Sequence, residues 1–417
     1  MDTIKKNPFE YGFISIGQCG GKILDAGFSR DYPVFAINTA LVDLQGLKRI
    51  PKDCQYLASI TDGGGAGKNI SVGELAIVQH KDEIVKRIST LFKNIKFLWL
   101  VAGLGGGSGT LGLIQMVQIL TELSIPHGII ATVPLNHDGT LEKSNCAIGL
   151  HQIYLASKQS NYLQTTIFIN NNDLKQKVMA AGNFTYENFW ELANMEIYSQ
   201  FEEIHSFANR ASETCMDTED TKVVATKQKG CLFYNKVELD LTGNSENGLA
   251  LSMLEMLKDT IYITGDILKG TAVGIVIERP KDFDTDGLMI DRLFDEIKAK
   301  FGAGAICKGV YPSSLTLKET LTLKKKPVTI YLIVSGIPFP LDYLKALGEE
   351  SKNEIKDLKA KETVTEDLGE DFDFIKDFLR ESAGPKPAQK IDLAVFYGKQ
   401  AEDWAGKWGG KNEKILS

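Results

Sequence analysis

Short apolar runs alternate with amphipathic stretches through the first half of the chain. These runs are continuous and rich in valine, isoleucine and aromatic residues, which is typical of parallel strands buried on both faces. Five such strands are predicted, over residues 11–16, 34–38, 97–102, 127–133 and 165–169. Between them, apolar residues recur at helical spacing, as at Ile84, Ile88 and Leu91. The pattern predicts a doubly wound, mostly parallel α/β sheet over residues 1–185, with ligands bound at the carboxyl ends of its strands.

A long central helix is predicted over residues 186–214, because apolar side chains recur every three or four positions from Phe189 to Ala208. A second, smaller α/β pattern follows over residues 215–340. Its predicted strands cover residues 230–234, 271–278 and 328–336, and its predicted helices cover 248–258 and 286–301. Since this half has its own apolar elements, we expect it to be a second domain with its own core.

The character of the chain changes after Pro340. Residues 349–381 carry twelve acidic and six basic side chains, nearly the whole net charge of -7. We expect an acidic helical region over residues 341–383. Its short apolar face would comprise Phe372, Ile375, Phe378 and Leu379. Residues 384–417 are rich in glycine, proline and lysine and are interpreted as a flexible tail.

The composition narrows the class of protein. Of the 417 residues, 43% are hydrophobic and 24% charged, the balance of an ordinary globular protein with two domains. The acidic net charge argues against strong direct binding of nucleic acid. The six cysteines and five histidines are scattered without metal-ligand spacing. The N-terminus lacks a signal-peptide core and no apolar run could span a bilayer, so we expect a cytoplasmic protein without a membrane anchor.

Three glycine-rich segments follow predicted strands or their connections: residues 17–22, 63–73 and 102–110. Glycine allows the backbone to point several N–H groups at a phosphate, and a helix that begins there adds the positive end of its dipole. The third segment is the most specific, because it lies between a buried strand and a helix and carries Ser108 and Thr110. For the first two segments, a tight turn and a surface loop remain as alternatives. None has the Walker A lysine or the GxGxxG dinucleotide pattern.

Together these loops carry a family resemblance. AGLGGGSGT (102–110) resembles the glycine signature of tubulin and FtsZ, and GQCGGKI (17–23) looks like the first nucleotide loop of tubulin. GGGAGKNISVG (63–73) is similar to the FtsZ loop that senses the γ-phosphate, and INTALVDL (37–44) is similar to the loop after its second strand. The resemblance extends from about residue 11 to residue 340 and implies a GTPase of the tubulin/FtsZ superfamily.

The resemblance also implies the contacts to GTP or GDP. The glycine loops and the second-strand loop contribute Gly17, Gln18, Cys19, Gly20, Asn38, Gly64, Gly65, Ala66, Gly67, Gly105, Gly106, Gly107, Ser108, Gly109 and Thr110. Asp138 lies at the ribose edge, and Asn171 in INNNDL contacts guanine. Trp190 and Asn194, four residues apart on one helix face, stack on the base and read its edge. Ordinary core packing is the alternative for Trp190.

CMDTEDTKVVATKQKG (215–230) resembles the FtsZ synergy loop and the helix after it. The resemblance places the catalytic carboxylates at Asp217 and Asp220; a solvated acidic turn is the alternative. Because these carboxylates belong to the other half of the chain, hydrolysis would occur between successive subunits of a head-to-tail filament. Mg²⁺ is expected with the triphosphate, without a nominated protein ligand.

Several positions depart from the FtsZ pattern: Gly21 replaces Asn, Leu111 replaces Gly, and Glu142 replaces an Arg near the ribose. With the acidic C-terminal helix, they favour a TubZ-like tubulin of plasmids or phages over a division-ring FtsZ. That resemblance implies a filament that moves plasmid or phage DNA through a DNA-bound adaptor on the tail. A dinucleotide-dependent oxidoreductase and a scaffold that binds nucleotide without hydrolysis remain alternatives from other classes.

Overall fold

The computed structural model describes residues 7–182, 185, 187–212, 214–240, 257–258, 260–279, 287–313 and 327–366. The chain divides into two compact units, residues 1–355 and 356–417. The sheet and the site described below belong to the first unit. Parts of three predictions lie outside the described residues: the helix over 248–258 up to residue 256, the apolar face from Phe372 to Leu379, and the tail over 384–417.

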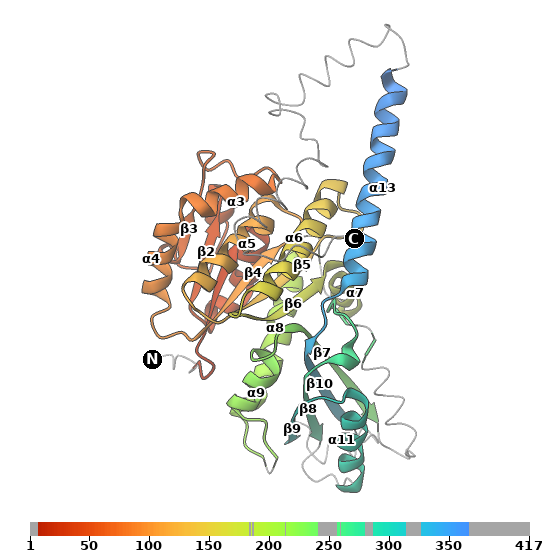
Figure 1. The fold of residues 1–417 in the computed structure, drawn as a ribbon. Coiled ribbons are helices and arrows are strands. Elements are labelled where there is room, and N and C mark those ends of the chain that lie inside the picture. The colour runs from red at the N-terminus through yellow and green to blue at the C-terminus, as the bar shows by residue number, and fades with distance from the viewer. Residues whose placement is uncertain are drawn as a thin grey trace. The chain divides into compact units, whose positions relative to one another are not determined.

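Ten strands of the described residues form one mixed sheet, in the order β3-β2-β1-β4-β5-β6-β7-β10-β8-β9 (Figure 1). The strands are β1 (Tyr11–Ile16), β2 (Val34–Asn38), β3 (Gln55–Leu57), β4 (Phe97–Gly103), β5 (His127–Val133), β6 (Leu163–Asn170), β7 (Gly230–Asp240), β8 (Ala272–Arg279), β9 (Ala305–Pro312) and β10 (Pro327–Ile337). From β3 to β7 all neighbours are parallel, whereas β10 runs antiparallel to β7 and β8. The predicted doubly wound α/β fold is confirmed.

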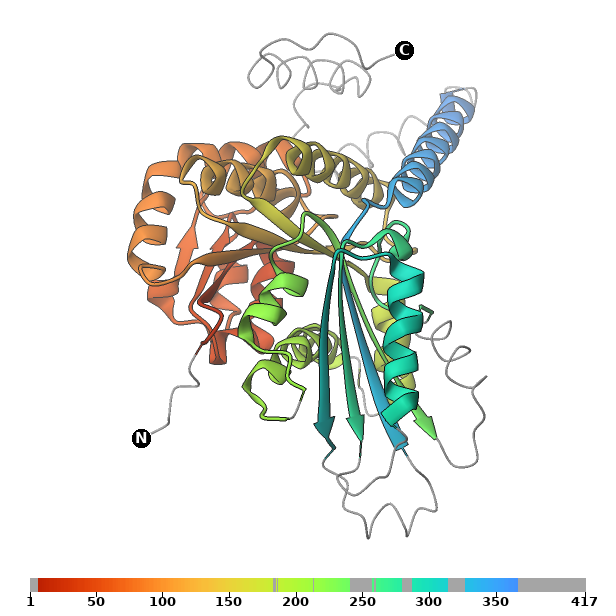
Figure 2. The ribbon, with the colours of Figure 1, turned by 60° about the horizontal axis from the view of Figure 1, so that its bottom comes forward.

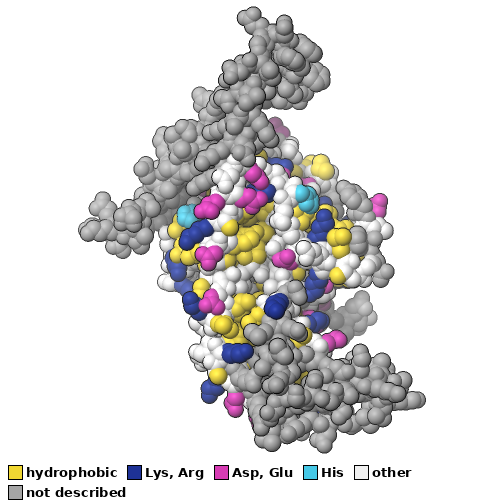
Figure 3. All heavy atoms as spheres, turned by 90° about the vertical axis from the view of Figure 1, so that its right-hand side faces the viewer, with side chains coloured by type: hydrophobic (Ala, Val, Ile, Leu, Met, Phe, Trp, Pro, Cys, Tyr) yellow, Lys and Arg dark blue, Asp and Glu magenta, His cyan; other side chains and the backbone are white. Residues whose placement is uncertain are grey.

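Helices connect and cover the strands. They are α1 (Gly17–Ala26), α2 (Leu41–Gln45), α3 (Ile70–Gln79), α4 (Lys81–Leu91), α5 (Gly107–Glu122), α6 (Thr140–Gln159), α7 (Asn171–Ala181), α8 (Phe189–Ser206), α9 (Thr218–Ala225), α11 (Gly287–Phe301) and α13 (Leu341–Glu366). None of the described helices is long and apolar enough to cross a bilayer. On the face in Figure 3, basic and acidic side chains are interspersed among small hydrophobic patches.

Strand β1 shows how the two faces of the sheet are covered. Tyr11 and Phe13 contact the ring of Phe201 on α8, with centroids 6.3 and 5.5 Å apart. Ile16 lies on the opposite face, where Gly112 of α5 approaches it so closely that an added Cβ would be 3.2 Å from the Ile16 side chain. Because side chains alternate along a strand, β1 is buried on both sides. That burial explains its continuous apolar sequence.

The two halves of the chain share this sheet. Strands β6 and β7 pair in parallel through Thr165–Gly230 and Thr166–Cys231. Figure 2 shows β7 to β10 fanning out from this junction, with α11 along one side. The second half therefore extends the first sheet as well as burying its own apolar side chains, such as Ile275 and Ile333.

The central helix is shorter than predicted. α8 ends at Ser206, followed by the 3-10 turn Phe207–Asn209 and an extended Arg210. The chain leaves the helix because the next segment bonds to β9 instead: Thr214 forms an antiparallel bridge with Val310, whose N–H donates to Thr214 O at 2.9 Å. The strand that makes this contact was not predicted from the sequence.

Candidate functional site

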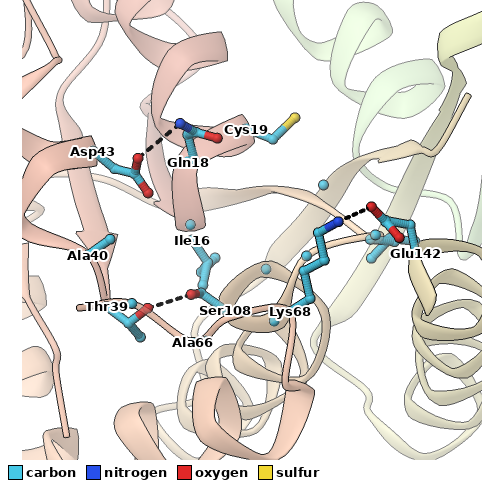
Figure 4. Close-up of a pocket in the computed structure, with 18 of the residues that line it drawn as sticks. Ile16, Gln18, Cys19, Thr39, Ala40, Asp43, Ala66, Lys68, Ser108 and Glu142 are labelled. Carbon is cyan, nitrogen blue, oxygen red and sulfur yellow. Dashed lines mark hydrogen bonds and ion pairs between the residues drawn. The ribbon is translucent and has the colours of Figure 1, made fainter. Parts of the chain in front are cut away.

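A cavity of about 450 Å³ opens at the carboxyl ends of the parallel strands. Its walls are the ends of β1, β2, β4 and β5, the loop 63–69 and the start of α7. A crevice at this edge is where doubly wound sheets bind ligands. Figure 4 shows side chains from α1, the β2 loop, the loop 63–69, α5 and α6 converging around it.

Helices α1 and α5 begin at this cavity with free N-termini. α1 follows Ile16 and α5 follows Gly106, and in the described part of the chain no side chain caps either helix. By contrast, Asn69 caps α3 by accepting from Ser71 N and Val72 N, and Asn170 caps α7. The first N–H groups of α1 and α5 are therefore left for an external acceptor, and a phosphate is a suitable one.

The glycines give the loops their close fit. Gly109 lies so near β4 that a Cβ there would be 2.5 Å from Gly103 O, and a Cβ on Gly107 would be 2.8 Å from Asn69 N. Gly17 and Gly65 have φ of +77° and +86°, in the left-handed region that favours glycine. A Cβ on Gly106 would meet no atom within 4 Å. The bare backbone at Gly106 thus borders open space, as a phosphate cradle requires.

Side chains tie the loops to one another. Thr39 Oγ1 lies 2.6 Å from Ser108 Oγ, which joins the β2 loop to α5 (Figure 4). Asp43 accepts hydrogen bonds from Gln18 Nε2 at 2.9 Å and Asn38 Nδ2 at 3.1 Å. Neutral amides thus hold its carboxylate in place on the cavity wall.

Lys68 and Glu142 form an ion pair at the opposite side of the cavity (Figure 4). The Lys68 ammonium group holds the pKa of the Glu142 carboxyl below its usual range. Among the described lining residues, Lys68 is the only base, against three carboxylates on Asp43, Asp138 and Glu142. The wall is therefore acidic in its side chains, and its attraction for an anion comes from the backbone.

The three asparagines of INNNDL have separate tasks. Asn170 Oδ1 accepts from Asn172 N at 2.9 Å and caps α7. Asn172 forms a reciprocal amide pair with Asn136 in the loop after β5, both bonds being 2.9 Å long. Asn171 lines the cavity. The two neighbours therefore fix the backbone on either side of Asn171.

Comparison with known proteins agrees with this geometry. Residues 10–179 match the family model described as Tubulin/FtsZ family, GTPase domain. These residues form a GTPase domain of the tubulin/FtsZ family. A tubulin-like protein CetZ from Pyrococcus furiosus is 26% identical over 335 residues, which cover 78% of this chain and 84% of that protein. A tubulin-like protein TubZ from Bacillus cereus is 23% identical over 222 residues, 53% of this chain and 47% of that protein.

The fold extends the likeness beyond the GTPase domain. A GTPγS-form protofilament of TubZ from Bacillus thuringiensis serovar israelensis superposes with a TM-score of 0.71 at 17% identity, covering 86% of this chain and 96% of that one. The family match over residues 10–179 confirms the predicted family and GTPase class for that domain, and the superposition adds a likeness of fold. The alternative of a dinucleotide-dependent oxidoreductase is excluded, because the domain that carries the cavity matches a GTPase family model.

The structure brings most of the predicted nucleotide residues of the GTPase domain together. Those that line the cavity are Gly17, Gln18, Cys19, Asn38, Gly64, Gly65, Ala66, Gly67, Gly105, Gly106, Gly107, Ser108, Gly109, Asp138 and Asn171. Burial raises the pKa of the Cys19 thiol, whose Sγ lies 3.3 Å from Thr132 Oγ1. Asp138 Oδ2 accepts from Leu135 N at 2.8 Å and so shapes the loop after β5.

Gly20 and Thr110 lie behind the cavity wall instead. A Cβ on Gly20 would be 2.1 Å from Val101 O, so this glycine allows α1 to pack against β4. The hydroxyl of Thr110 lies 2.6 Å from both Leu104 O and Gly106 O and braces the loop from inside. Trp190 and Asn194 also lie outside the lining: Trp190 is 45% exposed and packs its edge on Phe189, whereas Asn194 is buried.

Asp217 and Asp220 likewise lie outside the cavity lining, at the start of α9. The loop before them is held by β9, because Met216 N donates to the Tyr311 hydroxyl at 2.8 Å and the same hydroxyl donates to Phe207 O at 3.2 Å. Asp220 also faces Cys307 on β9: burial and this carboxylate raise the pKa of the thiol to about 11. β9 therefore sets the position of both carboxylates.

Sequence reasoning missed several lining side chains, chiefly Asp43, Lys68 and Glu142. Lys68 lies inside a predicted glycine loop, where the glycines indicate backbone donors and give no signal for a side-chain contact. Asp43 follows Asn38 by five residues, and one turn of α2 brings its carboxylate back to the wall. The sequence distinguishes Glu142 only as a departure from the FtsZ pattern.

Proposed function

We propose that this chain is a GTP-dependent, filament-forming GTPase that hydrolyses GTP at the contact between successive subunits. The observation that carries the proposal is the placement of two groups of residues on different elements. The glycine loops and the uncapped starts of α1 and α5 surround the cavity, while Asp217 and Asp220 lie outside its lining on α9. Since Asp217 and Asp220 do not line the cavity of their own chain, the catalytic carboxylates would reach a bound triphosphate from a neighbouring molecule.

Binding would use the features of the cavity in turn. Backbone N–H groups at the starts of α1 and α5 would bind phosphate oxygens, and Asn171 and Asp138 would face the nucleoside. Neither Trp190 nor Asn194 lines the cavity. Their proposed role in reading the base therefore rests on the family resemblance alone. The amide of Asn171 offers a donor and an acceptor to the edge of guanine.

Mg²⁺ would accompany the triphosphate. An acidic wall with one lysine would repel four phosphate charges unless a divalent cation shielded them. Mg²⁺ prefers oxygen ligands. The wall offers a carboxylate at Asp43 and hydroxyls at Thr39 and Ser108, and the nucleotide would add phosphate oxygens. Asp43 would hold the cation, and the amides of Gln18 and Asn38 would orient its carboxylate.

Hydrolysis would require the α9 carboxylates of the next subunit to position a water molecule beside the terminal phosphate. A head-to-tail contact of this kind does not close on itself and yields filaments. Loss of the terminal phosphate removes contacts to loop 63–69, which would weaken the contact between subunits.

The filament is proposed to move or position plasmid or phage DNA through a DNA-bound adaptor that binds the tail. What supports this is the likeness in fold to TubZ together with the change of composition after Pro340. Truncation after Gly384 should leave GTP hydrolysis unchanged and abolish DNA segregation. Normal segregation by the truncated chain would remove the adaptor proposal and leave the GTPase proposal intact.

Electron microscopy of the purified protein tests filament formation. We expect long filaments with GTP and Mg²⁺, and dispersed protein with GDP or after chelation of Mg²⁺. ATP with Mg²⁺ is the matched control and should give no filaments. Absence of filaments with GTP over a wide range of protein concentration would contradict the proposal.

A further inference from the structure

The first turns of α6 hold the two glycine loops of the cavity together. The buried Asn145 side chain donates through Nδ2 to Lys68 O at 2.9 Å and to Gly105 O at 3.2 Å. One carbonyl belongs to the loop 63–69 and the other to the loop before α5. Because a primary amide has two N–H donors, a single side chain fixes the separation of both loops. Any shift of α6 at this position changes the shape of the cavity.

Glu142, one turn earlier on the same helix, makes a second connection. It forms the ion pair with Lys68 described above. Its Cβ also lies against the loop before α5, since a Cβ on Gly105 would be 3.3 Å from it. The start of α6 thus touches both loops through side chains that leave the helix on the cavity side.

Lys143, between these two residues, connects α6 to α13 instead. Its side chain is only 8% exposed, and its Nζ lies 2.8 Å from Glu350 Oε1 and 2.7 Å from Glu354 Oε1. Thr140 Oγ1 donates to Glu354 Oε2 at 2.8 Å. The glutamates are four residues apart, so both face the same lysine. All four residues belong to the first compact unit of the chain.

This lysine depends strongly on its partners. A buried ammonium group left without a counter-charge is costly, so loss of both glutamates would force the side chain toward water. The two carboxylates raise the pKa of the Lys143 ammonium group, which therefore stays charged at neutral pH. Undocking of α13 would then free the start of α6, which carries Glu142 and Asn145.

We propose that Lys143 is a positioning residue that couples the docking of α13 to the shape of the nucleotide cavity. The inference builds on the proposed function, because it assigns a consequence to the binding of guanine nucleotide. A docked α13 holds α6 so that Asn145 and Glu142 close the two loops on the nucleotide. Release of α13 opens the loops and lets the nucleotide leave.

The first experiment measures release of a fluorescent GDP analogue from the full chain, below the concentration at which it assembles. Lys143→Met should speed release about three- to tenfold, the range expected for coupling of this kind. The double variant Glu350→Gln/Glu354→Gln should speed release of the analogue to the same extent. The triple variant should match Lys143→Met alone, because all three changes remove one interaction. Lys81→Met, which breaks the surface ion pair with Glu122, is the matched control and should release GDP at the parent rate.

The second experiment uses the reciprocity of coupling. Bound GDP should slow amide hydrogen exchange in residues 341–355 of the parent protein, and this effect should vanish in Lys143→Met. A loss of packing alone would change exchange equally with and without GDP. Thermal unfolding within a few degrees of the parent would show that the variants are folded.

The outcomes separate the two proposals. The coupling would be overturned if both sets of variants released GDP at the parent rate. It would also be overturned if GDP did not change hydrogen exchange over residues 341–355 of the parent protein. Either result would leave the GTPase proposal intact. A parent protein that binds no guanine nucleotide would overturn the proposed function, and this inference with it.

Discussion

Asp217 accepts a hydrogen bond through Oδ1 from the Asp220 N–H, at 2.9 Å. The two carboxylates therefore share the first turn of α9, with Asp217 as its N-cap. An N-cap aspartate is a common structural device, so its position alone does not make Asp217 catalytic. Asp220 has no capping task of this kind, which makes it the sharper test of catalysis.

Asp220→Ala should bind GTP like the parent, because Asp220 does not line the cavity. Hydrolysis should fall by about 100-fold or more, the usual effect of removing a group that positions or activates water. Filaments of this variant should persist longer than those of the parent, because the terminal phosphate that stabilises the contact between subunits is retained. Phosphate release and light scattering measure the two effects together.

Glu219→Ala is the matched control on the same helix. Glu219 is exposed and pairs with Lys222 and Lys227, and such surface pairs contribute little to stability. The Glu219→Ala variant should therefore hydrolyse GTP at the parent rate. Equal rates in Asp220→Ala and Glu219→Ala would show that α9 does not supply the catalytic carboxylates.

Asn171 should matter more for base choice than Asn194, because only Asn171 lines the cavity. Loss of a buried hydrogen bond costs roughly 1–3 kcal/mol, so Asn171→Ala should weaken GTP binding about tenfold and narrow the preference over ATP. Competition titrations with GTP and ATP measure both quantities. If Asn194→Ala weakened GTP binding and base preference more than Asn171→Ala, the base would be read mainly by Asn194 on α8.

Stability should fall in mild acid because of two buried histidines. Burial lowers the pKa of His127 and of His205 to about 4. An unfolded chain takes up these protons near pH 6.5, whereas the folded protein takes them up only near pH 4. The free energy of unfolding therefore decreases as pH falls from 6.5 to about 4.

His205→Phe should make this decrease shallower. One proton fewer corresponds to roughly 1.4 kcal/mol per pH unit, and the phenyl ring keeps the stacking against Phe201, whose centroid is 4.2 Å away. Urea titrations at several pH values measure the slope, with the exposed His137→Gln as control. An unchanged slope in His205→Phe would show that His205 is not neutral in the folded protein.

The sequence predicted those parts of the fold whose signal is local. β1 and β2 have the predicted bounds because both are continuously apolar and buried on both faces. β9 was missed because buried residues alternate along it with more exposed ones such as Lys308, and because it contains Gly309, as suits an edge strand. The length of α8 was overestimated for the same reason, since its end depends on a bridge to β9.

The site divides in a similar way. The glycine loops were predictable because a phosphate cradle needs glycine in consecutive positions of one segment. The contacts of Asn145 and Lys143 were not, because each joins segments about 40 to 210 residues apart and depends on how α6 packs. No spacing within α6 reveals that Asn145 joins two loops, or that Lys143 contacts α13.

The central claim is that the catalytic site forms only between subunits. The most direct test is the rate of phosphate release per subunit, measured with saturating GTP and Mg²⁺ from well below to well above the concentration at which filaments appear. We predict almost no release below that threshold and a steep rise above it. A rate per subunit that stays constant across the whole range would contradict hydrolysis at the contact between subunits.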